Sequence, residues 1–163
     1  MNYTLNLMFT FLLLACATVK ADITASVIVV DNGNELFRAW NSNPAEGISI
    51  SPVQIASRGE FLSVIVLFSG CAANAEGNCN VTLDMVVLDP GGNIYGEFKG
   101  HELWINKPAP NAGQMQLGVD YMGIVVEPND LPGNYSVLIK AHDMHTGQTA
   151  TSKTAFEVEP TSN

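Results

Sequence analysis

Short runs of alternating apolar and polar residues, separated by turn-forming residues, constrain the fold of this 163-residue chain more than any other feature. Alternation with a period of two places apolar side chains on one face of a strand and polar side chains on the other. The pattern is clear in residues 23–30, 80–88 and 148–158, while 61–69 is apolar on both faces, as expected of a central strand. Clusters of Gly, Pro, Asn and Asp bound these runs. The chain is therefore predicted to be all-β.

Local signals between these runs predict how the strands connect. Asn32-Gly33 is typical of a tight hairpin turn, so Glu35 to Trp40 is predicted to be the return strand, with a short helical turn as the alternative. Residues 93–98 are predicted to pair with 80–88 across the turn that contains Pro90. Residues 101–113 have no pattern and are predicted to be a long Pro-rich loop. Strands at this spacing favour a β-sandwich.

The segment Asp130-Leu131-Pro132-Gly133-Asn134-Tyr135 resembles the corner before the penultimate strand of immunoglobulin-like and fibronectin-III-like domains. On that resemblance Tyr135 is the corner tyrosine, a structural residue. The resemblance is one of architecture over residues 48–160, and it implies an Ig-like antiparallel β-sandwich of about seven to nine strands. Residues 80–88 contain no tryptophan and no inter-sheet disulfide is expected, so the chain is more similar to bacterial Ig-like modules than to antibody domains.

The N-terminal residues predict export. Residues 7–17 are apolar and uncharged, and this run is too short for a membrane span of roughly 20 residues but typical of a secretory signal peptide. Cleavage after Ala21 would release a single domain, residues 22–163, into the periplasm or the medium. Alternatively, Leu13-Leu14-Ala15-Cys16 resembles a bacterial lipobox, which would make the protein a membrane-anchored lipoprotein lipidated at Cys16. Leu14 fits that motif poorly, so the soluble form is favoured.

The net charge excludes one class of partner, and the cysteine content predicts a disulfide. The exported chain would carry six basic and 16 acidic residues, a net charge of −10, because Lys20 is lost with the leader. Nucleic-acid binding needs clustered Lys and Arg and is excluded. Two cysteines, Cys71 and Cys79, remain in an oxidising compartment and are predicted to form a disulfide, since their spacing is not that of a zinc site.

The candidate metal site is the segment His142-Asp143-Met144-His145. Two imidazoles and a thioether, from His142, Met144 and His145, suit copper. The alternative is that these residues form the polar tip of the last hairpin. Apart from this segment there is one further histidine, His101, and no Met-rich cluster, so the hairpin tip is favoured and no cofactor is expected.

The candidate binding surface is His101-Glu102-Leu103-Trp104, because an aromatic residue in a loop on a rigid sandwich is a common recognition device. The alternative is that Trp104 folds back onto the core. No nucleophile with an oriented base is evident, so an enzyme is not expected. The sequence favours an exported binding or accessory module that recognises an envelope or extracellular protein through a loop or a sheet edge. The alternatives are a periplasmic copper-binding protein and an inhibitor of a secreted hydrolase.

Overall fold

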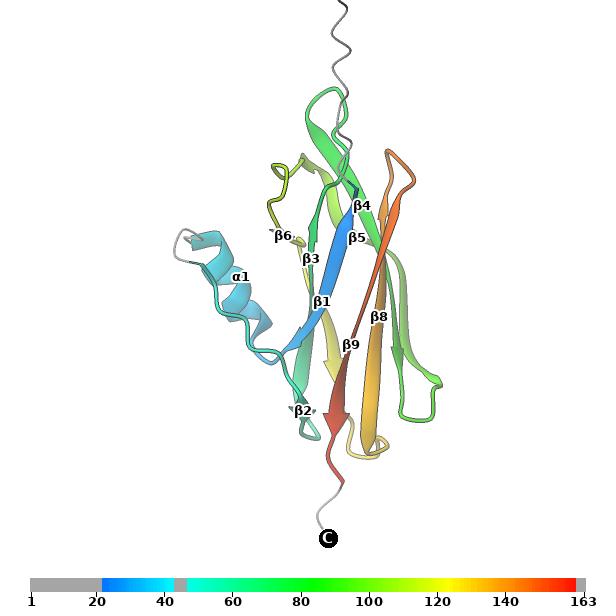
Figure 1. Ribbon diagram of the computed structural model, residues 1–163. Helices are drawn as coiled ribbons and strands as arrows, with labels where there is room; N and C mark the ends of the chain where they lie inside the picture. The colour runs from blue at the N-terminus through cyan, green and yellow to red at the C-terminus, as the bar shows by residue number, and fades with distance from the viewer. Residues whose placement is uncertain (1–21, 43–46, 161–163) are drawn as a thin grey trace, which may run out of the picture.

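The strands form two sheets, and burial alternates along the strands that pair in the middle of the second sheet (Figure 1). The computed structural model describes residues 22–42 and 47–160, so the predicted signal peptide and Cys16 lie outside the described residues. In the first sheet, β3 (Phe61–Ser69) pairs with β1 (Thr24–Val30) on one side and with the short strands β6 (Gln116–Leu117) and β7 (Met122–Val125) on the other.

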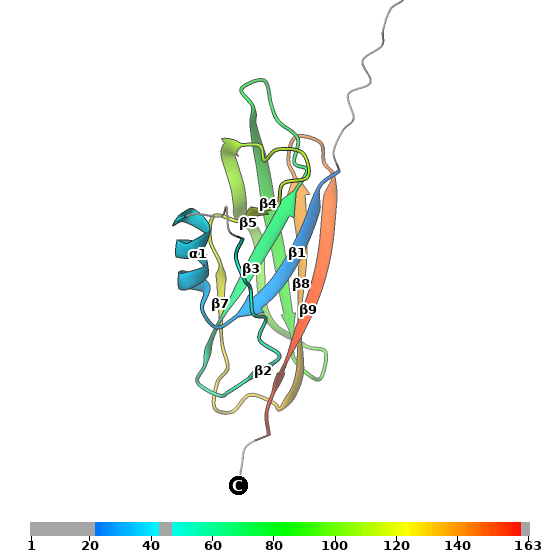
Figure 2. The ribbon, with the colours of Figure 1, turned by 60° about the vertical axis from the view of Figure 1, so that its left-hand side comes forward.

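The second sheet has five strands. Their order is β2 (Ile55–Ala56), β9 (Thr149–Val158), β8 (Gly133–Asp143), β4 (Asn78–Leu88) and β5 (Ile94–Pro108). Neighbouring strands are antiparallel except for β2, which runs parallel to β9. The two sheets pack face to face, as Figures 1 and 2 show. The prediction of an all-β sandwich is confirmed.

The strand pairing is that of an immunoglobulin-like sandwich. If β1, β3, β4, β7, β8 and β9 are lettered A, B, C, E, F and G, strand B lies between A and E, and strand F lies between C and G. The tyrosine corner has its hydrogen bond at the start of strand F, where the Tyr135 hydroxyl donates to the Leu131 carbonyl at 3.0 Å. The motif from Asp130 to Tyr135 therefore identifies β8 as strand F.

The core lies between the sheets and follows the predicted alternation. From Cys79 to Val87 in β4 and from Tyr135 to Asp143 in β8 the odd-numbered residues point inward and are buried, whereas the even-numbered residues point outward. The inward residues belong to one core cluster with the inner face of β3, which includes Leu83, Met85, Ile139, Leu62, Val64, Val66 and Phe68. Full burial of one such side chain is worth about 1.5–3 kcal/mol.

The prediction of a return strand at residues 35–40 is wrong, because Gly33–Ser42 forms the helix α1. The Asn32 carbonyl accepts hydrogen bonds from the amides of Glu35 and Leu36, so a helix begins where the hairpin turn was predicted. Leu36, with Phe37 and Trp40 beside it, packs on the outer face of β3 around Ile65. Figures 1 and 2 both show α1 on the side of the first sheet that faces away from β8. This helix explains why β3 is apolar on both faces.

The prediction of a long loop at residues 101–113 is wrong for 101–108, since β5 continues to Pro108, whereas 109–113 lie outside the strands. Its pairing with β4 is interrupted by four register shifts. Each such irregularity inverts the side-chain alternation, so no period of two is visible in the sequence. Within residues 22–42 and 47–160, no helix has the length and apolarity needed to cross a membrane.

Candidate functional site

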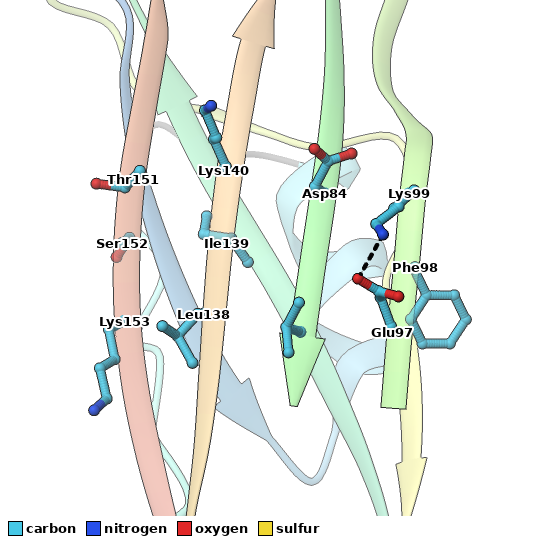
Figure 3. A pocket seen from close by; sticks show the side chains of 11 residues that line it. Asp84, Glu97, Phe98, Lys99, Leu138, Ile139, Lys140, Thr151, Ser152 and Lys153 are labelled. Atoms are coloured by element: carbon cyan, nitrogen blue, oxygen red, sulfur yellow. Dashed lines mark ion pairs between the residues drawn. The ribbon is translucent and has the colours of Figure 1, made fainter. Parts of the chain in front are cut away.

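The outer face of the second sheet is hollowed into a groove of about 540 Å³ (Figure 3). Side chains from β5, β4, β8 and β9 line it, so the groove runs across four strands. Its volume lies within the range of about 300–1,000 Å³ that ligand sites occupy. Unlike the outer face of β3, this face has no helix packed on it among the described residues.

The strand register arranges the groove in cross-strand rows. One row runs Glu97, Val86, Leu138, Lys153, because each is the register partner of the next. The next row runs Asp84, Lys140, Thr151. Val86 and Leu138 are half-buried and form an apolar floor at outward positions, where water-exposed strands ordinarily carry polar residues. Polar and charged side chains border this floor.

Both carboxylates of the groove are hydrogen-bonded within the protein. Glu97 Oε1 lies 2.8 Å from Lys99 Nζ (Figure 3), and this hydrogen bond raises the pKa of the exposed lysine. Asp84 accepts a 2.9 Å hydrogen bond from the Gly100 amide and lies 2.9 Å from His142 Nε2. The Gly100 amide is the largest cause of the lowered pKa of Asp84, and His142 and Lys140 add to it. Asp84 is therefore ionised at neutral pH.

Three lysines face these two carboxylates, so the groove carries one net positive charge in a chain of net charge −9. The ion pairs of the described residues are Lys99–Glu97 and His142–Asp84. Neither includes Lys140 or Lys153. In Figure 3 the Lys140 side chain extends upward from β8 and the Lys153 side chain extends downward from β9, so both lie on the β8–β9 side of the groove. Lys140 is two residues from Leu138 on β8, and Lys153 is the register partner of Leu138. The apolar floor therefore has two cations beside Leu138.

The candidate metal residues His142 and Met144 contact other side chains of the sheet. His142 points outward beside Asp84, the Met144 sulfur accepts a hydrogen bond from Thr82 Oγ1 at 3.5 Å, and His145 is exposed. Among the described residues no group of three or more His, Cys, Asp or Glu side chains could hold a metal ion. Within the part of the chain that the structure describes, no cluster of His, Cys, Asp or Glu therefore supplements the three predicted copper ligands.

The predicted recognition segment, residues 101–104, is part of strand β5 and not of an exposed loop. Leu103 is buried, and the Trp104 ring packs against Phe68 at 5.7 Å between ring centroids. The indole N–H of Trp104 donates to the Pro108 carbonyl at 3.0 Å. His101 is half-buried and Glu102 is exposed. Trp104 thus contributes mainly to the core, and its remaining surface lines a smaller pocket, of about 240 Å³, together with Trp40 of α1.

The disulfide prediction is confirmed, since Cys71 and Cys79 are bonded with their Cα atoms 6.1 Å apart. Sequence analysis missed the residue that anchors this loop. Asp143 is 1% exposed, and its carboxylate accepts hydrogen bonds from the amides of Ala72, His145 and Thr146. The last two bonds form an Asx turn, which the Asp-x-x-x-Gly spacing could have indicated. The hydrogen bond to Ala72 joins residues that are 71 positions apart, so no local sequence pattern could have predicted it.

The groove residues were also missed. The available signal was apolar residues at outward positions of strands that alternate elsewhere: Val86 and Leu138, which line the groove, and Leu88. The significance of Val86 and Leu138 depends on the register that makes them neighbours, and this register joins segments about 50 residues apart in the chain.

No family model matches the chain, and no curated protein matches its sequence. Among solved structures, it is similar to a family 123 glycoside hydrolase from Clostridium perfringens, with a TM-score of 0.51 and 14% identity. That match covers 85% of this chain and 27% of the hydrolase, so the chain spans about a quarter of the enzyme's length. At this identity the similarity concerns the fold alone.

Two weaker similarities are to smaller proteins. The CARDB domain of the PF1109 protein from Pyrococcus furiosus has a TM-score of 0.42 and 11% identity, with coverage of 97% of this chain and 99% of the domain. A Niemann-Pick type C2 protein from the Japanese carpenter ant has a TM-score of 0.44 and 9% identity, with coverage of 83% and 93%.

Proposed function

We propose that this protein is an exported, non-catalytic binding module that recognises a protein partner through the groove on the outer face of β5, β4, β8 and β9. The observation that carries the proposal is the apolar floor formed by Val86 and Leu138, on a sheet face that no helix within residues 22–42 and 47–160 covers. On the opposite outer face, the corresponding apolar surface of β3 is covered by α1. Apolar surface left open in a sandwich is a common interaction site.

A groove on the sheet face is a better candidate than a sheet edge. The edge strand β5 is interrupted by four register shifts, and both Gly100 and Asn106 have a positive φ. Bulged edges of this kind impede the pairing of a further strand. The opposite edge strand of this sheet, β2, has two residues. The groove, by contrast, lies on paired strands whose backbones hold its side chains in place.

Two observations support export. The Cys71–Cys79 disulfide is compatible with an oxidising compartment. Asp22, which would follow the cleavage site, already accepts a 2.7 Å hydrogen bond from Gln148 Nε2 in the described fold. Removal of the predicted leader would therefore leave the contacts of the sandwich in place.

Site-specific photo-crosslinking in cells of the source organism tests the proposal. A photoreactive amino acid replaces Thr151, an exposed residue of the groove, and in a matched control it replaces Ala39 on the exposed side of α1. We expect a discrete protein adduct from position 151, identified by mass spectrometry, and its loss when Leu138→Gln is added. The absence of an adduct at position 151, or the same adduct from both positions, would overturn the proposal.

A further inference from the structure

We infer that the segment recognised in the groove is an acidic, amphipathic peptide, with aliphatic side chains on the floor and carboxylates against Lys140 and Lys153. This inference rests on the proposed function and specifies its partner.

The charge distribution selects an anionic ligand. Three of the seven Lys and Arg residues in the chain line this single groove, although the chain has a net charge of −9. The two carboxylates of the groove are already engaged, Glu97 by Lys99 and Asp84 by Gly100 and His142. Lys140 and Lys153 belong to neither ion pair of the described residues. A ligand with carboxylates beside an apolar face would complement the ammonium groups of Lys140 and Lys153, which flank Leu138.

The floor selects a peptide over an anionic polysaccharide. The backbones of β4 and β8 are paired on both sides within the sheet, so the floor offers almost no free hydrogen-bonding groups to sugar hydroxyls. Ser152, at the margin, turns its hydroxyl inward to the Val27 amide. Val86 and Leu138 instead offer an apolar surface that suits Leu, Ile or Val side chains.

The molecule itself contains an example of such packing. On the outer face of the first sheet, the ten-residue helix α1 places Leu36, Phe37 and Trp40 against an apolar patch around Ile65. A short amphipathic segment of similar length would cover Val86 and Leu138 in the same manner. Recognition of one apolar face, with charges at its border, is a common mode of peptide binding.

Selection from a library of random twelve-residue peptides displayed on phage tests the inference, with the folded protein as bait. We expect the enriched peptides to combine Asp or Glu with Leu, Ile or Val and to bind more weakly as salt rises. The double variant Lys140→Glu/Lys153→Glu should weaken their binding at least tenfold. The matched control, Arg38→Glu/Lys107→Glu, makes the same change in net charge elsewhere and should leave the affinity within about twofold. Both pairs are exposed, and equal urea midpoints verify folding.

The outcomes separate this inference from the function on which it rests. Enriched peptides that are neutral or basic, yet lose binding in Leu138→Gln, overturn the acidic ligand and retain the groove as a binding site. Stronger competition by hexagalacturonic acid than by the peptides favours a polysaccharide and overturns the peptide. Failure to enrich any peptide overturns the peptide ligand, while crosslinking from position 151 still decides whether the groove binds a protein. Enriched peptides whose binding none of the groove variants alters overturn the acidic ligand and its placement in the groove.

Discussion

A single buried carboxylate, that of Asp143, joins the disulfide loop to the turn between β8 and β9. It accepts hydrogen bonds from the Ala72 amide at 2.8 Å, the His145 amide at 2.9 Å and the Thr146 amide at 3.2 Å. Asp143→Ala would leave these donors without their partner in a site that is 1% exposed. We expect a loss of about 3 kcal/mol in the free energy of unfolding, measured by urea denaturation at pH 7.

The matched control for Asp143 is Glu157→Ala, which removes an exposed carboxylate from β9. Its effect should stay within about 0.5 kcal/mol. An unchanged urea midpoint in Asp143→Ala would show that water replaces the carboxylate without cost.

The environment of Tyr95 predicts that the free energy of unfolding falls at alkaline pH. Its hydroxyl lies 2.6 Å from Asp130 Oδ2, and burial, with Asp130 as the next cause, raises the pKa of Tyr95 above its usual value of about 10. The folded state therefore holds the phenolic proton more tightly than the unfolded state does. The stabilisation is complete below about pH 10 and is lost as the pH rises from there toward the higher pKa of the folded state.

Urea midpoints measured from pH 7 to pH 11 test this effect. We expect the wild-type midpoint to fall above about pH 10, and Tyr95→Phe to fall less steeply because it has no phenol to ionise. Tyr121→Phe, at a tyrosine whose hydroxyl donates to the Asn34 side-chain oxygen at 2.9 Å, serves as the control and should retain the wild-type slope. Equal slopes in wild type and Tyr95→Phe would refute the assignment.

At the level of elements, prediction from sequence succeeded where the signal was local. The double-sided apolar pattern of 61–69 and the alternation of 80–88 gave β3 and most of β4. It failed for α1, because four apolar residues in a ten-residue segment fit a short strand as well as a helix, and packing on β3 selects the helix. It failed for the second half of β5 because register shifts remove the alternation on which a strand prediction depends.

The disulfide constrains the connection between β3 and β4. The bond closes a loop with a sequence separation of 8, for which the chain-entropy estimate is about 2.5 kcal/mol. We expect Cys71→Ala/Cys79→Ala to lose about that much free energy of unfolding, and a reducing agent to lower the stability of the wild type but not that of the variant. Equal sensitivity of both proteins to the reductant would contradict a role for this bond.

At the scale of the whole molecule, the two outer faces of the sandwich differ, and this difference could not be predicted from sequence. The groove requires that Leu138 adjoin both Val86 and Lys153, which depends on the register of three strands. The outer face of the first sheet is covered because α1 packs against β3. Both arise from long-range pairing, whereas the sequence patterns report only on neighbours along the chain.

The contacts of Asp22 and Ile23 bear on the processing that the proposed export requires. The Ile23 side chain is 5% exposed, and the Asp22 carboxylate accepts a hydrogen bond from Gln148, so a chain that begins at Asp22 keeps both contacts. We expect intact-mass analysis of the protein from its source organism to give a chain that begins at Asp22. Ala21→Arg should block this processing, because signal cleavage needs a small residue before the cut. Cys16→Ser should be processed normally, whereas a lipoprotein would fail to mature in Cys16→Ser and would carry acyl chains on Cys16 in the wild type.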